Sequence, residues 1–380
     1  MPNPWPLVAL GRVIRQRAEF SRIDDLAAYM RVRVQLHAQG VVLRDIVVGT
    51  EIKTKSQQVC RAGEFLVAEI DAKVGGFGIV PDDLAGAIVS SHYFLFELDR
   101  TAIHRGFLDY FIRTPFFQDQ VRAQGSTNYA AIRPTDVLEY EIPLPPLDEQ
   151  QRMAARIEQL AAKIQEAQDL RAEARNQADG FISSAHLHAS AGRSVTLAQI
   201  LVLREVAEPV QPGKAFPQVG VKGFGQGLFA RPAVQAHETT YRAFNRLYDG
   251  AIILSQVKGW EGAVASCDTE FAGRYVSPEY RTFECIPGQA LPAYMAALIA
   301  VPWFWSKLAN VTRGVGARRE RIHPHMFLEL EIPMPTPDRQ KALLPAFRRL
   351  DALKRLQAET AAELDALLPS ILDTALKGEL

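Results

Sequence analysis

Arginine side chains are concentrated in one short segment of the chain that also contains glycine. Residues 311–325 include Arg313, Arg318, Arg319 and Arg321, against a single glutamate. Guanidinium groups neutralise backbone phosphates and form paired hydrogen bonds with guanine edges in the major groove. Taken alone, this composition favours an ordinary solvated loop, and contact with a DNA duplex is the alternative that matching groups in both halves of the chain support.

Smaller groups of basic and amide side chains occur at comparable places in the two halves of the chain. Most of them follow a predicted strand or flank the polar segment 125–128. Such side chains contact phosphates and base edges in protein–DNA complexes, so we expect them to extend the DNA-binding surface. They are Lys53, Lys55, Gln57, Lys73, Arg122, Asn128, Arg133, Gln256 and Lys258.

The sequence lacks the common motifs of catalysis, including GxxxxGK[ST], GxSxG and HExxH. The Glu-Ile-Lys triplet at 51–53 precedes Pro81-Asp82, which reverses the order of a PD…(D/E)xK nuclease. His323 and His325 have no carboxylate or cysteine at ligand spacing. We therefore expect a binding protein with no catalytic residues and no metal site.

Composition limits the class of protein. The 380 residues are 48% hydrophobic, enough for two or three globular units. Because 43 basic residues balance 43 acidic ones, attraction to DNA must come from local patches. Three cysteines without metal spacing, no signal-like N-terminus and no long apolar run together predict a cytoplasmic protein.

The chain contains an internal duplication. Residues 121–151 align on residues 311–341 without a gap at a shift of 190, half the chain length. Matches further upstream share a shift of 187, with three residues gained near position 118. A period this long excludes a solenoid and predicts two copies of one domain, each ending in a Glu-Ile-Pro strand and a long helix.

Residues 148–189 are predicted to form one of these helices, because they contain no proline and small or apolar residues recur at alternating spacings of four and three. The second helix, about 338–377, has a rougher apolar pattern, and we expect a kink at Pro369. An apolar stripe needs a partner in water, so we expect the helices to pack antiparallel on each other. Two unrelated surface helices are the alternative. The first stripe comprises Met153, Ile157, Leu160, Ile164, Ala167, Ala174, Ala178, Phe181 and Ala185, and the second comprises Leu343, Phe347, Leu350, Leu353, Leu364, Leu367, Leu368 and Ile371.

The intervening regions, 1–147 and 190–337, mix short β-rich runs with helical runs. The predicted fold class is α+β: two duplicated mixed α/β domains separated by two long antiparallel coiled-coil helices, 148–189 and 338–380, with pseudo-twofold symmetry.

The segment IPLPPLDEQ at Ile142–Gln150 resembles the hallmark that follows each target-recognition domain in specificity subunits of type I restriction–modification systems. The segment IPMPTPDRQ at Ile332–Gln340 resembles a degenerate second copy, and the final Gly-Glu-Leu is also similar to the family. Arg339 and Pro345 depart from the family pattern.

This resemblance implies that domains 1–147 and 190–337 each bind one half of a bipartite DNA site. The helices are expected to set the spacing and to dock two methyltransferase subunits, with restriction and translocase subunits as further partners. S-adenosylmethionine is expected on the methyltransferase, where a flipped adenine is methylated, and no cofactor on this non-catalytic chain. The helix residues expected to serve docking and spacing are Met153, Ile157, Leu160, Ile164, Phe347, Leu350, Leu364 and Ile371.

Two other functions stay open at this point. One is a structural adaptor that uses the duplicated domains for protein partners and binds no DNA. The other is a stand-alone restriction nuclease, which would need a divergent metal site that includes Glu51 or Asp82.

Overall fold

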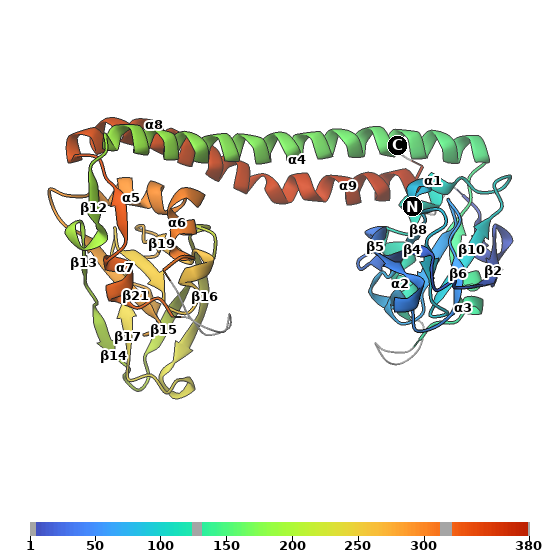
Figure 1. The fold of residues 1–380 in the computed structure, drawn as a ribbon, viewed down its shortest axis with the longest axis horizontal. Helices are drawn as coiled ribbons and strands as arrows, with labels where there is room; N and C mark the ends of the chain where they lie inside the picture. Colours follow the sequence, from blue (N-terminus) through green and yellow to red (C-terminus); the bar gives the residue numbers. More distant parts are fainter. Residues whose placement is uncertain (1–4, 124–130, 312–320, 379–380) are drawn as a thin grey trace. The chain divides into compact units, whose positions relative to one another are not determined.

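The computed structural model describes residues 5–123, 131–311 and 321–378 (Figure 1). These residues divide into two compact units, one of residues 1–168 with 362–380 and one of residues 169–361. The division runs through both long helical segments, so each unit contains one globular domain and parts of two helices.

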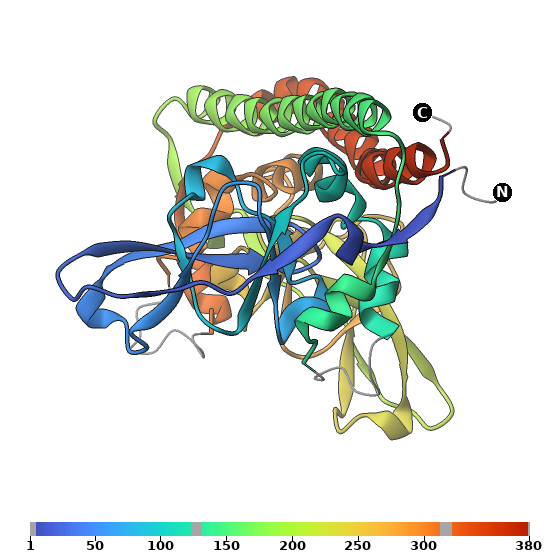
Figure 2. The ribbon, with the colours of Figure 1, turned by 90° about the vertical axis from the view of Figure 1, so that its right-hand side faces the viewer.

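The described part of the first domain contains three sheets, four short 3-10 helices and three short α-helices. The sheets have the orders β1-β11, β2-β10-β7-β8 and β3-β6-β9-β4-β5. Figure 2 faces this unit and shows the long β4–β5 hairpin in blue. The strands are β1 (Leu7–Ala9), β2 (Ile14–Arg17), β3 (Phe20–Arg22), β4 (Ala28–Gln35), β5 (Gly40–Val48), β6 (Ser56–Val59), β7 (Phe65–Ala68), β8 (Phe77–Ile79), β9 (Ile88–Val89), β10 (Tyr93–Leu98) and β11 (Glu141–Pro143). The helices are η1 (Leu10–Arg12), η2 (Gly49–Glu51), η3 (Asp71–Val74), η4 (Asp82–Leu84), α1 (Arg105–Phe111), α2 (Pro115–Ala123) and α3 (Pro134–Glu139).

The second domain repeats this topology strand for strand. Its sheets have the orders β12-β22, β13-β21-β18-β19 and β14-β17-β20-β15-β16. The parallel pairing of β4 with β9 in the first domain recurs as β15 with β20. The strands are β12 (Ser194–Thr196), β13 (Leu201–Leu203), β14 (Ala207–Pro209), β15 (Ala215–Val221), β16 (Leu228–Gln235), β17 (Ala243–Arg246), β18 (Ile252–Ser255), β19 (Val264–Ser266), β20 (Tyr275–Val276), β21 (Tyr280–Cys285) and β22 (Glu331–Pro333). The helices are η5 (Leu197–Gln199), η6 (Ala236–Glu238), η7 (Gly259–Glu261), α5 (Pro292–Ile299), α6 (Pro302–Leu308) and α7 (Pro324–Leu328). The predicted duplication and α+β class are confirmed.

A two-stranded sheet closes each domain where the chain enters and leaves it. β1 pairs with β11, and β12 pairs with β22, in the same register. The Ile142 and Ile332 side chains of these exit strands are 0% exposed. The Glu-Ile-Pro segment therefore returns the chain to its entry point, from which the long helix begins.

The first long helix, α4 (Leu147–Ser190), is continuous over 44 residues. Its apolar stripe begins as predicted, with Met153 and Ile157 buried. Further along, the prediction for Phe181 is wrong, because this side chain is 50% exposed whereas Ile182 is buried. An α-helix drifts by about 20° per heptad relative to a strict seven-residue repeat, and four heptads shift the buried position by nearly one residue.

The second helical segment consists of two helices, α8 (Pro337–Glu359) and α9 (Ala361–Leu376). The break between the two helices falls at Thr360, whereas Pro369, the predicted site of a kink, lies inside α9 (Figure 1). There the Thr360 hydroxyl donates to the carbonyl of Leu356, and Arg171 donates to the Thr360 carbonyl. Side chains that compete for backbone groups in this way favour a helix end.

The long helices pack antiparallel, as predicted. In the second unit, Arg171 of α4 contacts Thr360 at the end of α8. About two turns further along α4, Asp179 pairs with Lys354, which lies earlier in α8, so the two helices run in opposite directions. In the first unit, α9 shares the apolar core with the start of α4. The alternative of two unrelated surface helices is therefore wrong.

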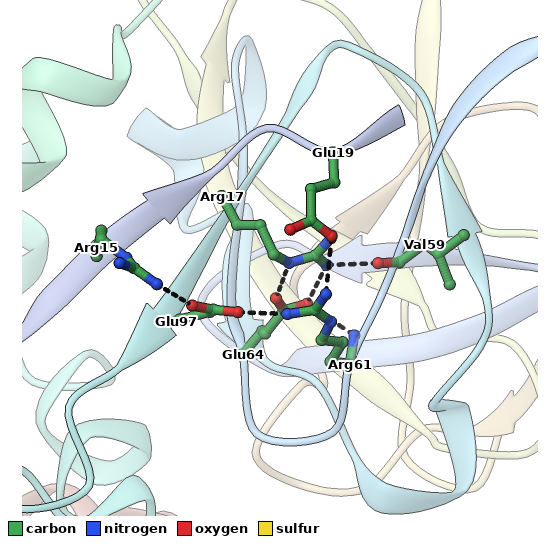
Figure 3. A network of polar contacts seen from close by, with 7 residues as sticks. All are labelled: Arg15, Arg17, Glu19, Val59, Arg61, Glu64 and Glu97. Atoms are coloured by element: carbon green, nitrogen blue, oxygen red, sulfur yellow. Dashed lines mark hydrogen bonds and ion pairs between the residues drawn. The ribbon is translucent and has the colours of Figure 1, made fainter. Parts of the chain in front are cut away.

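A charged network joins two sheets of the first domain (Figure 3). Arg17 of β2 forms a two-bond ion pair with Glu64 and donates to the Val59 carbonyl of β6. The Arg17 and Glu64 side chains are only 6% and 4% exposed. The hydrogen bond with Glu64 raises the pKa of Arg17. Around this pair, Arg61 contacts both Glu97 and Glu19.

The second domain joins the equivalent sheets with neutral groups. Asn245 of β17 donates to the Thr282 hydroxyl of β21 at 2.9 Å and accepts from the backbone of Val206 at 2.9 Å. Thr282 and Asn245 are buried. The counterpart of Arg17, Arg204, is half-exposed and pairs with Glu284 at the surface. The same topology is thus held by two different buried polar arrangements.

We predict that Glu64→Gln destabilises the first domain by about 3 kcal/mol, because the buried Arg17 charge then keeps only a longer contact, 3.4 Å, with the exposed carboxylate of Glu19. Hydrogen exchange of the β7 and β10 amides measures this effect. Arg15→Ala is the control, because Arg15 has an 83% exposed side chain and its pair with Glu97 contributes at most about 1 kcal/mol. Equal destabilisation by the two substitutions would contradict the account of the network.

His186 of α4 is enclosed in the second unit. Its side chain is 0% exposed, its Nδ1 lies 2.8 Å from the Tyr294 hydroxyl, and the Trp303 ring packs against it. Burial lowers the pKa of His186 to about 4, with a smaller contribution from Lys307, while a hydrogen bond with the backbone of Pro333 acts in the opposite direction. The imidazole is therefore neutral in the folded protein at neutral pH.

We predict that His186 makes the second unit less stable in acid. In the unfolded chain this histidine binds a proton once the pH falls below about 6.5, whereas in the folded unit it stays neutral down to about 4. The free energy of unfolding is therefore at its full value above about pH 6.5 and decreases as the pH falls towards about 4. The loss reaches about 3 kcal/mol. Urea unfolding at about pH 7 and about pH 4.5 should show a smaller pH effect in His186→Gln than in the wild type. The exposed neighbour His188→Gln serves as control and should leave the effect unchanged.

Candidate DNA interface

Each domain has a loop directly after a central strand of its four-stranded sheet. Residues 69–75 follow β7, and residues 256–262 follow β18. The N–H of Ile132 donates to the carbonyl of Glu69 at 3.1 Å, and the N–H of Ile322 donates to the carbonyl of Gln256 at 2.9 Å. Both isoleucines are buried. Each loop is therefore attached to the segment that leads into α3 or α7.

The tips of the β4–β5 and β15–β16 hairpins contact the other end of these loops. The N–H groups of His37 and Ala38 donate to two carbonyls of loop 69–75, and those of Phe224 and Gly225 do the same for loop 256–262. All four residues have a left-handed backbone, with φ between 55° and 65°. The left-handed conformation costs an L-residue about 1–2 kcal/mol, whereas glycine adopts it freely. The hydrogen bonds therefore hold strained residues, His37, Ala38 and Phe224, against the loops.

The two copies share this backbone arrangement but present different side chains. Ile70 and Val257 occupy equivalent positions and are 54% and 41% exposed. The next position carries Asp71 in the first domain and Lys258 in the second, and both are exposed. A shared frame with opposite charges at one exposed position suits two domains that bind different DNA sequences. Composition did not indicate Ile70 and Val257, which emerge only when the copies are aligned at the shift of 187.

Two predicted DNA contacts of the first domain are contradicted by burial. Gln57 is 6% exposed and donates to the Thr54 carbonyl at 2.7 Å, and Lys73 is 8% exposed within η3. Gln57 lies in β6 and Lys73 in η3, and the sequence did not show which side of either element is covered.

The other predicted residues of the first domain are accessible but occupy separate places. Lys53 is exposed, whereas Lys55 contacts Asp25 and donates to the carbonyl of Gly49. Arg133 is exposed where α3 begins, beside Ile132 and thus beside loop 69–75. Arg122 is exposed on α2. Of this set, Arg133 is the residue that the structure brings to the loop.

The structure brings three predicted residues of the second domain together. Gln256, Lys258 and Arg321 meet at loop 256–262, where the backbones of residues 256 and 322 are hydrogen-bonded. Arg321 pairs with Glu279 at 2.8 Å and stays half-exposed. Gln256 is 4% exposed, so its predicted side-chain contact with DNA is contradicted. The remaining predicted residues, Asn128, Arg313, Arg318 and Arg319, lie outside the described residues.

The predicted helix residues divide by exposure. Met153, Ile157 and Phe347 are buried in the cores of their units, so they hold the helices in place and cannot meet a partner. Leu160, Ile164, Leu350, Leu364 and Ile371 are partly buried. Six large apolar side chains are exposed on the same helices: Leu170, Phe181 and Leu187 of α4, Leu353 and Leu356 of α8, and Leu367 of α9. Phe181, Leu353 and Leu367 belong to the predicted stripes, whereas periodicity did not select the other three.

Little in the described part of the chain suits covalent chemistry or metal binding. Burial raises the pKa of each of the Cys60, Cys267 and Cys285 thiols to about 12, so they are poor nucleophiles at neutral pH. Among the described residues, no group of three or more His, Cys, Asp or Glu side chains could hold a metal ion. Within the same ranges, no helix combines the length and apolarity needed to span a membrane.

Comparison with known proteins agrees with this geometry. Residues 28–174 match the family model described as type I restriction modification DNA specificity domain. No curated protein matches the chain. The family match therefore runs from β4 of the first domain to residue 174 within α4.

Two solved structures resemble the chain over its full length. One is a chain from work on complex assembly and conformational transition of the type I R-M system, at 22% identity and a TM-score of 0.66, covering 100% of this chain and 99% of that one. The other is the HsdS subunit from Thermoanaerobacter tengcongensis, at 22% identity and a TM-score of 0.50, covering 100% and 98%. At this identity the likeness establishes the fold of the chain. The family match assigns residues 28–174 to the type I restriction modification DNA specificity domain.

Proposed function

We propose that each domain recognises one half of a bipartite DNA target, with loops 69–75 and 256–262 and the adjoining residues Arg133 and Arg321 at the DNA. The supporting observation is that two domains with one topology hold equivalent loops by equivalent hydrogen bonds while presenting different side chains. Two different half-sites require this combination of a shared docking frame and divergent contacts. A protein adaptor or a nuclease would not require this combination, and the geometry favours neither of them.

We further propose that the long helices set the distance between the half-sites. A continuous helix of 44 residues is about 66 Å long, and its antiparallel partners stiffen it. The exposed leucines and phenylalanine on α4, α8 and α9 are the proposed docking surface for two methyltransferase subunits. Restriction and translocase subunits would then bind to this assembly.

The chemistry is assigned to those partners. We propose that the methyltransferase binds S-adenosylmethionine and methylates a flipped adenine, whereas this chain binds no cofactor and catalyses no step. The complex would act on DNA in the cytoplasm.

The first test is long-read methylation sequencing of the host genome with and without the gene. We expect a split motif with methyladenine on both strands that disappears on deletion. Methylation of a continuous motif, or persistence of the split motif after deletion, would contradict the proposal.

We predict that Lys258→Ala weakens binding of the methyltransferase complex to its target. One lost phosphate contact should lower the slope of log affinity against log salt by about one, whatever the base sequence nearby. Fluorescence anisotropy of a labelled duplex between about 50 and 200 mM salt measures this change. Asp71→Ala is the matched control at the equivalent position of the first domain, and removal of its negative charge should not weaken binding. If both variants bind like the wild type, the loops do not lie at the DNA.

A further inference from the structure

The glutamine that ends each Ile-Pro hallmark is buried at the base of a long helix. Gln150 is the fourth residue of α4 and Gln340 the fourth residue of α8. Both side chains are 0% exposed. A buried amide must find partners for one acceptor and two donor hydrogens, so its surroundings fix its orientation.

Gln150 joins three segments of the first unit. Its Oε1 accepts from the N–H of His104 at 2.8 Å, at the residue that precedes α1. Its Nε2 donates to the carbonyls of Ala102 at 3.0 Å and Pro145 at 2.9 Å. The side chain thus connects the first turn of α4 to the turn before α1 and to the proline segment after β11.

Gln340 makes the same contacts in the second unit. Its Oε1 accepts from the N–H of Leu291 at 2.9 Å, and its Nε2 donates to the carbonyls of Gln289 at 3.0 Å and Pro335 at 2.8 Å. The partners are backbone groups at equivalent positions, although the residues that carry them differ. The arrangement is therefore independent of neighbouring side chains and specific for the glutamine.

No other side chain satisfies these three backbone groups. Glutamate would turn a second acceptor towards two carbonyls, asparagine is shorter by one methylene, and alanine would leave three buried groups unpaired. The apolar contacts of Met153 and Ile157 also attach α4 to its domain, but apolar packing has no preferred direction. The directional restraint at the base of each helix comes from the amide.

We propose that Gln150 and Gln340 are positioning residues that fix the angle between each recognition domain and its spacer helix, and thereby restrict the separation of half-sites that the complex accepts. This proposal rests on the proposed function. A domain that can pivot at the base of its helix should still recognise its half-site but should tolerate a wrong separation.

The test uses the full chain with its methyltransferase and a library of duplexes. Each duplex carries both wild-type half-sites, separated by spacers that range from shorter to longer than the natural one. In Gln150→Ala and in Gln340→Ala, we expect methylation at spacers one base pair longer or shorter to rise roughly tenfold relative to the natural spacer. The half-site sequences should stay the same. Gln151→Ala and Lys341→Ala are matched controls, because each changes the exposed next residue of the same helical turn.

A second variant separates positioning from folding. Gln150→Glu keeps the size and the acceptor, and its buried carboxyl group has a raised pKa, so it regains one donor as pH falls to about 6. Spacer selectivity in this variant should therefore improve towards the wild type at lower pH.

The outcomes are distinguishable. If the wild type methylates no bipartite target, the proposed function fails. If the wild type does so and the alanine variants keep its spacer selectivity, the positioning role fails. If the alanine and glutamate variants all unfold, or lose methylation at every spacer while remaining folded, the glutamines serve folding or assembly instead, and the proposal is equally overturned.

Discussion

The pairing of entry and exit strands at the base of each domain is the constraint on which the rest of the molecule depends. β1 with β11, and β12 with β22, bring the two ends of a domain together. Because the long helix begins only a few residues after the exit strand, its start is restrained by main-chain hydrogen bonds. The hydrogen bonds of a buried glutamine then orient the first turn of the helix. Without the paired strands and the buried glutamine, the helix could change its direction relative to the domain. With them, the helix can act as a spacer of fixed direction.

The interior of the domains shows how a duplicated fold can diverge without losing its shape. Arg17 and Glu64 join two sheets through a buried ion pair in one copy, and Asn245 and Thr282 do so through neutral groups in the other. A buried ion pair and a buried neutral pair are both tolerated when each partner is present. Removing one partner of either pair leaves a buried polar group unpaired, which is costly. Selection at the exposed loops could therefore proceed separately in each copy.

Much of the architecture could be predicted from the sequence because it follows from period and repetition. The shift of 187–190 residues predicted two equal domains, and the apolar spacing predicted antiparallel helices. The details that failed are those decided by small differences in geometry. Phe181 is exposed because a heptad pattern drifts on a straight helix, and the helix break lies at Thr360, which composition does not distinguish from any other threonine.

The binding residues were harder to predict than the fold. Gln57, Lys73 and Gln256 have suitable chemistry, but burial removes them from the surface. In a strand or a tight turn, the face that a residue presents depends on which sheet covers it, and local sequence does not contain that information. Lys258 and Arg321 are far apart in the sequence but belong to neighbouring segments, because the loop after β18 is hydrogen-bonded to the segment before α7.

The central claim is that the domains determine the half-sites and the helices determine their separation. The most direct measurement removes one heptad from α4 together with the heptad opposite it in the second helical segment, and then determines the methylated motif. Seven residues correspond to about 10 Å of helix, or about three base pairs of DNA. The account predicts unchanged half-sites with a spacer shortened by about that amount. Altered half-site sequences, or an unchanged spacer, would contradict it.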